Sequence, residues 1–508
     1  TKTPLFRPTT VPTVSPTVPS TSPTMVPSID PTASPTLKLS ASPSYPSLIP
    51  NSTLCQSQRE WNILGSDIEG TSQGDEMGST ISMSDDGQRV AVASIFSNAA
   101  GLHSGVVNIY DFDEGLESWI PVGNPIAGEK RGDMAGDAIA LSGNGCYIAI
   151  GSALNDGGSD VAGQVRVFRF SPTCGDWVQQ GHSINGVAPM DFNGGAVSIS
   201  YDGNRVAMGA GGGAGGVWWG GSGGGRGAER NEGGGYNAGQ VRIFEFYGAD
   251  WVQIGDDLLG ENENDRFGIS VSLSGDGNSL AVGAYYSDIV ALNAGYVKVF
   301  RYRSDEDRWI QLGDIIHGFG VNALSGYRVV LSHFGTRVAI SSFEIVDMSP
   351  EKGSVRIFDF QGSFWQAMGR PIYGNAKGDR GGMSVSLSRR GDIVVIGSPL
   401  NDEAGENSGY ARVFGFCFES EGWLQLGQAI AFGTAGDNCG TSVSLSSDGK
   451  RVAVGCPLSS KGRYKAGLAR IYETTHFFPQ CVAMRTLVDD FLATQVTPPH
   501  RLTFVEYG

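Results

Sequence analysis

The chain has 508 residues, of which 75 are glycine and 17% are charged, and its formal net charge is −16. This acidic balance argues against a nucleic-acid partner, since phosphate binding needs a basic surface. No apolar run approaches the length of a membrane-spanning helix, so we expect no transmembrane segment.

Residues 1–54 differ in composition from the rest of the chain: they are rich in Pro, Ser and Thr and almost uncharged. Such a segment cannot bury a core and is typical of an extended, O-glycosylated stalk. Asn51 opens an Asn-Ser-Thr sequon at the base of this stalk. The candidate O-glycosylation sites include Thr9, Thr10, Thr13 and Thr17. We therefore expect an extracellular, secreted glycoprotein at a cell surface.

Seven tryptophans then recur at nearly constant spacing, separated by 58, 58, 74, 58, 56 and 58 residues. Each is followed 26 residues later by a glycine, from Gly87 in the first unit to Gly449 in the last. A fixed period of this size indicates a repeat architecture. The tryptophans are Trp61, Trp119, Trp177, Trp251, Trp309, Trp365 and Trp423.

One unit shows the predicted elements clearly. Residues 268–274 alternate as a strand does, and 275–278 have the composition of a tight turn. Further strands are predicted at 279–283, 296–302 and 309–313. The unit is therefore a four-stranded antiparallel meander.

A four-stranded blade repeated around an axis makes a β-propeller. We predict an all-β fold, a seven-bladed β-propeller over residues 55–474, with an insertion at 209–239 in blade 3. The last unit lacks a Trp strand, whereas Trp61–Gly65 precedes the first unit. The N-terminal segment should therefore supply the fourth strand of the last blade and remove its open edge.

Short motifs recur at the ends of the strands, namely Phe267-Gly268, Gly283-Ala284, Gly397-Ser-Pro399 and Gly455-Cys-Pro457. With these motifs the units resemble the FG-GAP repeat family, the propeller type known from integrin α-subunits. It covers about 61–473 and is nearest to a secreted variety with Gly-Asp-x-x-Gly openings and a Trp-x-Gln-x-Gly strand. The family's calcium loop needs several Asp residues between the first two strands.

The corresponding turns here are Ser84–Gly87, Ser274–Gly277 and Ser388–Gly391, which carry too few oxygen ligands for calcium. We expect no calcium at these turns and no other cofactor. Acidic groups also occur between the second and third strands, at Asn155-Asp156 with Asp160 and at Asn401-Asp-Glu403 with Glu406. We interpret them as solvated turn residues rather than as a calcium site.

The seven cysteines favour an oxidising compartment. The candidate disulfides are Cys439 with Cys456, Cys146 with Cys174, and Cys55 with Cys481. Cys417 is left over, and buried thiols remain the alternative, so the connectivity stays open. The tail 475–508 has a helical apolar rhythm that could pack on the ring or on a partner.

The long loop 209–239 holds the candidate binding residues Trp218, Trp219, Arg226 and Arg230. Adjacent tryptophans in a glycine-rich loop are costly to leave in water. The loop could cap the channel, insert into a protein partner, or stack on a glycan.

Other motifs have a structural explanation. Arg131-Gly-Asp133 matches an integrin-recognition tripeptide, but most units place Gly-Asp at the same position before the first strand, so we expect a structural role. A basic residue recurs in six third strands, where we expect hydrogen bonds between blades. These residues are Arg166, Arg242, Lys298, Arg356, Arg412 and Arg470.

No catalytic residues are predicted, because the six histidines are scattered without metal-ligand spacing and no nucleophile or phosphate-binding motif occurs. The sequence favours a non-enzymatic extracellular protein with a structural or adhesive role in a coat, fibre or filament, which associates with itself or with other coat proteins. A glycan-binding propeller is the first alternative and a polysaccharide-active enzyme the second.

Overall fold

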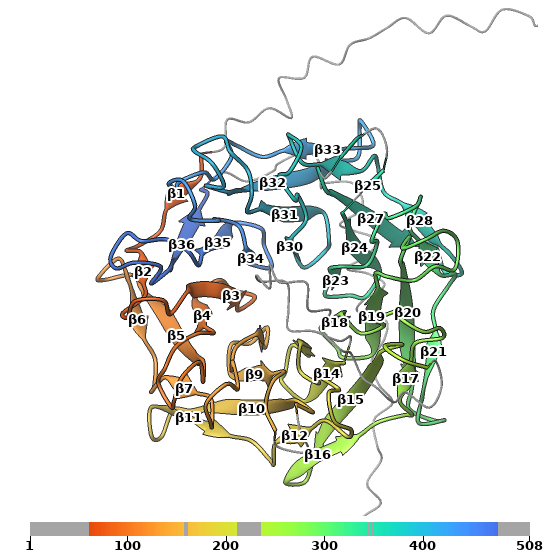
Figure 1. Ribbon diagram of the computed structural model, residues 1–508, viewed down its shortest axis with the longest axis horizontal. Helices are drawn as coiled ribbons and strands as arrows, with labels where there is room; N and C mark the ends of the chain where they lie inside the picture. Colours follow the sequence, from red (N-terminus) through yellow and green to blue (C-terminus); the bar gives the residue numbers. More distant parts are fainter. Residues whose placement is uncertain are drawn as a thin grey trace, which may run out of the picture. The chain divides into compact units, whose positions relative to one another are not determined.

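The computed structural model describes residues 60–156, 161–210, 235–343, 345–346, 349–350 and 352–475. These residues form a ring of seven antiparallel sheets, the predicted seven-bladed propeller (Figure 1). The stalk, Asn51 and the tail 476–508 lie outside the described residues. In the described part of the chain, no helix is long and apolar enough to span a bilayer.

The first strand of each blade lies nearest the axis of the ring and lines its channel (Figure 1). The first strands are β3 (Met77–Met83), β8 (Ala138–Leu141), β13 (Ala196–Ile199), β18 (Ser270–Leu273), β23 (Val329–Leu331), β30 (Ser384–Leu387) and β34 (Ser442–Leu445).

The second and third strands form the middle of each blade. The second strands are β4 (Arg89–Ser94), β9 (Tyr147–Ser152), β14 (Arg205–Gly209), β19 (Ser279–Ala284), β24 (Arg337–Ser342), β31 (Ile393–Ser398) and β35 (Arg451–Cys456). The third strands are β5 (Val106–Asp113), β10 (Gln164–Ser171), β15 (Gln240–Tyr247), β20 (Tyr296–Arg303), β27 (Ser354–Phe360), β32 (Tyr410–Cys417) and β36 (Leu468–Glu473). Both sets are largely buried, because each blade is covered by a neighbour on either face.

In six blades the outer edge is made of two short pieces that both pair with the third strand, and in blade 6 it is a single strand. The first piece carries or adjoins the periodic tryptophan: β1 (Asn62–Ile63), β6 (Ser118–Pro121), β11 (Asp176–Gln179), β16 (Asp250–Gln253), β21 (Arg308–Gln311), β28 (Trp365–Ala367) and β33 (Gly422–Gln425). The second piece, which the sequence reading missed, is β2 (Ile68–Glu69), β7 (Ile126–Ala127), β12 (Ile184–Asn185), β17 (Leu258–Leu259), β22 (Ile316–His317) and β29 (Ile372–Tyr373). A separate hairpin joins β25 (Ile345–Val346) and β26 (Ser349–Pro350).

Ring closure occurs as predicted. β1 and β2 both pair with β36, so the N-terminal segment completes the sheet that also contains β34 and β35. The paired residues include Ile63 with Tyr472 and Ile68 with Ala469. The last blade therefore has no open outer edge.

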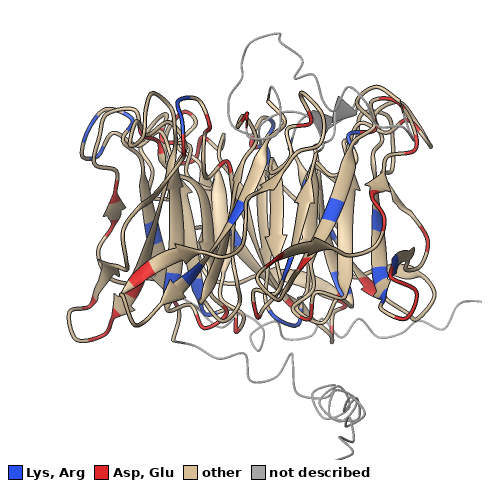
Figure 2. Ribbon diagram, turned by 90° about the horizontal axis from the view of Figure 1, so that it is seen from below, with Lys and Arg blue, Asp and Glu red and all other residues tan. Residues whose placement is uncertain are grey.

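The apolar core lies between neighbouring blades. One cluster, for example, joins Val107 and Ile109 of blade 1 to Ile148 and Ile150 of blade 2, and Trp177 closes its outer side. Figure 2 shows the complementary pattern, with most charged residues in the loops above and below the strands. Burial of apolar side chains between blades is the main favourable contribution to such a fold.

The periodic tryptophans also link the blades by hydrogen bonds. Each indole N–H donates to a backbone carbonyl of the preceding blade over 2.7 to 3.1 Å, and that carbonyl lies three residues after the preceding tryptophan. The bond from Trp61 to Leu426 completes this circle of seven. The acceptors are Leu64, Val122, Gln180, Ile254, Leu312, Met368 and Leu426.

The periodic glycine is required by the turn that joins the first two strands. In all seven units its φ lies between 66° and 78°, a left-handed conformation that a residue with a Cβ rarely adopts. A serine three residues earlier caps the same turn, as when Ser84 Oγ accepts the Arg89 N–H at 3.0 Å. The two residues together make every first turn nearly identical.

Candidate functional site

A belt of backbone hydrogen bonds encircles the channel at the first-turn face. The belt residue of each blade lies two positions before the turn glycine, and its carbonyl accepts an N–H from the preceding blade. Six of the seven donors are belt residues themselves, and in blade 2 the donor is Asn144. The belt is Asp85, Gly143, Tyr201, Gly275, His333, Arg389 and Ser447, and the Ser447 N–H donates to Asp85 to close it.

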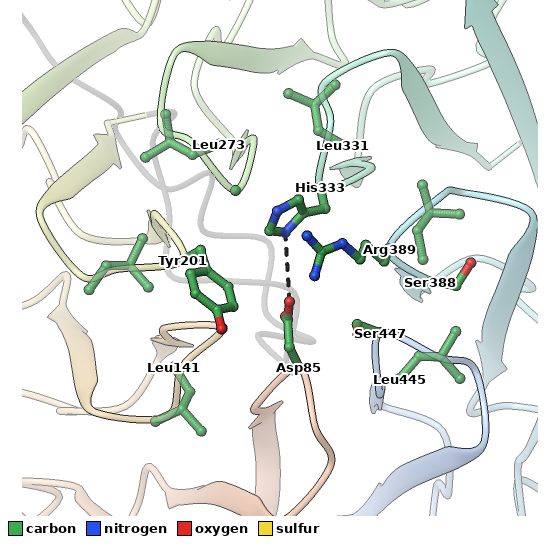
Figure 3. A pocket seen from close by; sticks show the side chains of 14 residues that line it. Asp85, Leu141, Tyr201, Leu273, Leu331, His333, Ser388, Arg389, Leu445 and Ser447 are labelled. Carbon is green, nitrogen blue, oxygen red and sulfur yellow. Dashed lines mark ion pairs between the residues drawn. The ribbon is translucent and has the colours of Figure 1, made fainter. Parts of the chain in front are cut away.

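Side chains of the belt fill the centre of the channel (Figure 3). Asp85 of blade 1 faces His333 of blade 5, with Oδ2 3.6 Å from Nδ1. Tyr201 packs edge-on against His333 at 5.5 Å between ring centroids, and Arg389 points toward the same centre in Figure 3. Charged and aromatic groups from four blades therefore meet at one point.

Two glycines of the belt make room for these rings. A Cβ at Gly143 would lie 2.2 Å from the Tyr201 ring, and a Cβ at Gly275 would lie 2.3 Å from the His333 ring. Any larger residue would displace the aromatic side chains. The belt glycines Gly143 and Gly275 are thus part of the site.

A small cavity of about 140 Å³ lies directly behind the belt. A ring of aliphatic side chains surrounds it, namely Leu141, Ile199, Leu273, Leu331, Leu387 and Leu445. A second cavity of about 290 Å³ is lined by the first strands of all blades and contains many serine and valine side chains. The smaller of the two cavities is thus the one that the belt residues line.

Burial and neighbouring charges shift the titration of the central pair. Burial raises the pKa of Asp85, although His333 and Arg389 oppose that shift. Burial and then the Arg389 charge lower the pKa of His333, and Asp85 and Asp276 only partly offset this. The site therefore favours a neutral imidazole near a guanidinium, with a carboxylate that is harder to ionise than usual.

The arrangement allows an electrostatic interaction across the ring. At 3.6 Å Asp85 and His333 lie within ion-pair distance once the imidazole is protonated, but the contact is too long for a good hydrogen bond. Ser388, which also lines the cavity, donates its hydroxyl to Asp392 at 2.8 Å. Within the described ranges, no group of three His, Cys, Asp or Glu side chains is arranged to hold a metal ion.

The Arg131-Gly-Asp133 tripeptide has the predicted structural role. Asp133 is buried, and its Oδ2 accepts the backbone N–H groups of Glu129 and Lys130 at 2.9 and 2.7 Å. Carboxylates at the same position in other blades are also buried and fold their loops in the same way. They are Asp75, Asp191, Asp265, Asp379 and Asp437.

The acidic residues between the second and third strands also act within their loops. Asp156 accepts the Val161 N–H at 2.9 Å, and Asp402 accepts the Asn407 N–H at 2.7 Å. Asn401 is buried and donates to Asp379. Asp160 lies outside the described residues.

The basic residues of the third strands form the predicted contacts between blades in five cases. Arg166, Arg242, Arg356 and Arg412 donate to backbone carbonyls of the preceding blade, and Lys298 pairs with Glu261. The sixth basic residue, Arg470, makes its ion pair within its own blade, with Asp67 next to β2 of the same sheet.

The cysteine predictions have mixed outcomes. Cys439 and Cys456 form a disulfide, because the register of β34 and β35 brings their Cα atoms to 4.0 Å. The predicted Cys146–Cys174 disulfide is wrong, since both thiols are free and exposed. Cys146 lies before β9, beside Phe170, whereas Cys174 lies beyond the end of β10 in the turn leading to β11.

Several predicted residues cannot be placed. Cys55 and Cys481 lie outside the described residues, as do the glycosylation candidates Asn51, Thr9, Thr10, Thr13 and Thr17. The binding candidates Trp218, Trp219, Arg226 and Arg230 also fall outside them. Cys417, which the pairing left over, is buried at the end of β32.

Sequence reasoning missed the belt itself. Its signal was present, since the position two before each turn glycine breaks the repeat with Gly, Tyr, His, Arg, Ser or Asp. Because such variation in a turn is ordinary, nothing in one unit shows that these residues meet. Only the closed ring brings Asp85 and His333 together across 248 positions.

Comparison with known proteins finds one partial family match. Residues 260–300 match the FG-GAP repeat family. No curated protein matches the chain.

The solved structures that resemble it are distant. A putative 6-phosphogluconolactonase from Bacteroides uniformis ATCC 8492 has a TM-score of 0.46 and 13% identity, covering 72% of this chain and 88% of that one. A periplasmic gluconolactonase from Pseudomonas aeruginosa has a TM-score of 0.43 and 13% identity, covering 74% and 97%. These values are too low to support a functional argument. The chain is thus a seven-bladed β-propeller that contains an FG-GAP repeat at residues 260–300.

Proposed function

We propose that the protein is an extracellular, non-enzymatic propeller module with a structural or adhesive role, which assembles by protein–protein contacts into a cell-surface coat, fibre or filament. Its partners would be further copies of the chain or other coat proteins.

The observation that carries this proposal is the role of the buried aspartates in the loops before the first strands. A buried aspartate recurs there in six blades, and those with named partners accept backbone N–H groups of their own loop. These hydrogen bonds use the carboxylates to hold their own loops in place. A rigid ring that presents loops is suited to binding rather than to chemistry.

Three further features support an extracellular location. The Cys439–Cys456 disulfide is of a kind that persists in oxidising compartments. The match to the FG-GAP repeat points the same way, because such repeats are typical of extracellular proteins. The Pro/Thr stalk and the Asn51 sequon favour glycosylation and display at a surface.

The test is made on native, glycosylated material. The protein should be recovered from the extracellular matrix in an assembled fraction visible by electron microscopy, and its intact mass should exceed the 53.5 kDa of the bare chain. Recovery only as a free monomer would contradict assembly. Specific retention by a panel of glycans would favour a lectin-like function, and turnover of a polysaccharide would favour an enzyme.

A further inference from the structure

An exposed apolar surface lies on two neighbouring loops of blades 4 and 5. The first loop joins β19 to β20, and the second joins β22 to β23. Six large apolar side chains there are between 36% and 57% exposed. We call this surface the blade 4 patch, and it consists of Tyr286, Ile289, Val290, Leu292, Phe319 and Val321.

Hydrogen bonds hold the two loops together. The Asn322 N–H donates to the Leu292 carbonyl at 2.7 Å, and the Asn293 side chain donates to that of Asn322 at 2.9 Å. Arg266 lies over the Tyr286 ring at 4.9 Å, and Arg356 lies over the Phe319 ring at 4.8 Å. The six side chains therefore belong to one surface on a rigid support.

The scaffold itself does not require apolar residues in the first loop. Counted back from the glycine that opens the third strand, Leu292 corresponds to Glu406 in blade 6, and Ile289 corresponds to Glu403. The backbone agrees with this equivalence, since the Glu406 carbonyl accepts the Gly436 N–H at 2.8 Å just as that of Leu292 accepts the N–H of Asn322. Blade 6 thus places two carboxylates where blade 4 places two aliphatic side chains.

The second loop shows the same contrast. Phe319 follows the glycine after β22, and the equivalent position holds Glu129 after β7 and Glu261 after β17. Val321, two residues further on, corresponds to Glu263. Since the fold accepts charged residues at these four positions, their exposed apolar side chains need another reason, and a contiguous exposed apolar patch commonly marks an interface.

Charge indicates which partner fits. The chain carries a net charge of −16, so two copies repel one another over most of their surface. The two loops of the blade 4 patch contain only one acidic residue, Asp288, whose Oδ1 already accepts the Asn293 N–H at 2.6 Å. Their one basic residue, Arg328, donates to the Met383 carbonyl of blade 6 at 3.3 Å. Two copies can meet at this surface without opposing carboxylates.

We propose that the blade 4 patch is the contact through which two copies of this chain associate. A two-fold arrangement places the same loops on both sides, so Leu292 and Phe319 of one copy pack against the patch of the other. The six apolar side chains form the centre of the interface, and the polar residues of the adjoining loops form its rim. This inference rests on the proposed assembly function and names the surface responsible.

The test compares two double variants of the full-length glycosylated protein. Ile289→Glu with Leu292→Glu copies Glu403 and Glu406 of blade 6, so the fold should accept it. The control, Ala99→Glu with Leu102→Glu, adds the same charge at the equivalent positions of blade 1. Sedimentation velocity over a range of concentrations measures association, and thermal melting verifies folding.

We expect the wild type and the control to associate, and the blade 4 variant to weaken association on the order of 100-fold with an unchanged melting temperature. Phe319→Glu, which copies Glu129 and Glu261, should act in the same direction. Association of both patch variants at wild-type strength would overturn the inference and leave the assembly function intact. A wild type that stays monomeric at every concentration, while native material is assembled, would assign assembly to other partners and also overturn the inference.

Discussion

The indole N–H of Trp61 donates to the backbone carbonyl of Leu426 at 2.8 Å, across 365 positions of sequence. The same bond joins each of the other pairs of neighbouring blades, but here it ties the N-terminal segment, which forms the outer edge of the last blade, to blade 6. Trp61 is 4% exposed and packs with Leu426 and Tyr472 in one core cluster. The ring closes through the same contact that joins its blades.

Trp61→Phe should therefore destabilise the protein by about 1 kcal/mol, the usual net value of a hydrogen bond, and Trp61→Ala by about 3–5 kcal/mol. Urea unfolding measures both. Ile63→Ala is the matched control in the same segment, because Ile63 is 55% exposed. Equal unfolding midpoints for wild type and Trp61→Ala would show that this segment does not close the ring.

Replacing both Cys439 and Cys456 by serine should lower the free energy of unfolding by about 3 kcal/mol, because the disulfide closes a loop of 17 residues in the unfolded chain. Cys146→Ser with Cys174→Ser should leave stability within about 0.5 kcal/mol, since both thiols are free and exposed. Thermal melting with and without reductant distinguishes the two. A large loss in the second variant would indicate that those cysteines pair.

Glu76 should make stability fall as the pH rises. Burial raises the pKa of this side chain to about 7, and Lys465 only partly offsets the effect. Its Oε2 is buried without a hydrogen-bond partner. The folded state therefore binds a proton more tightly than the unfolded chain, and the resulting stability is lost between pH 4.5 and about 7.

Glu76→Gln should accordingly be more stable than the wild type at pH 8, by on the order of 1 kcal/mol after allowing for the exposed part of the side chain. The advantage should disappear below pH 4.5, where the carboxyl is protonated in both states. Urea unfolding at pH 8 and pH 4 measures the difference. A gain of equal size at both pH values would attribute it to packing rather than to titration.

His333 should make stability fall as the pH falls, which is the opposite of the effect of Glu76. Burial and Arg389 lower its pKa in the folded protein, so the unfolded chain takes up a proton first as the pH falls below the ordinary value of 6.5. The wild type should lose stability from pH 7.5 to 5.5 relative to His333→Asn. The loss should be smaller than about 1.4 kcal/mol, the free energy that corresponds to one pKa unit. Parallel unfolding curves for the two proteins would contradict this.

Asp85→Asn provides the companion measurement. The Asp85 carboxylate raises the pKa of His333, so its removal should lower that pKa further. An NMR titration of the imidazole reports the change directly. An unaltered titration would mean that the two side chains do not face one another across the channel in solution.

The blade pattern was readable from the sequence because each blade satisfies the same local requirements. A glycine with positive φ, a capping serine and an outer tryptophan recur at constant spacing, and each acts within one turn or between adjacent blades. The strand ends and the closing segment followed from that spacing. The second piece of the outer edge escaped notice because it is only two residues long in each of the six blades that have it.

The tertiary structure alone decided which irregular residues meet. Asp85, Tyr201, His333 and Arg389 share a position in the repeat but differ in chemistry, and only closure into a ring turns that shared position into a common centre. Cys146 and Cys174 show that two residues of the same blade need not meet. The strand register keeps them apart, and both thiols stay free. Periodicity follows from short-range backbone geometry, whereas contacts across the channel depend on the number and tilt of all the blades together.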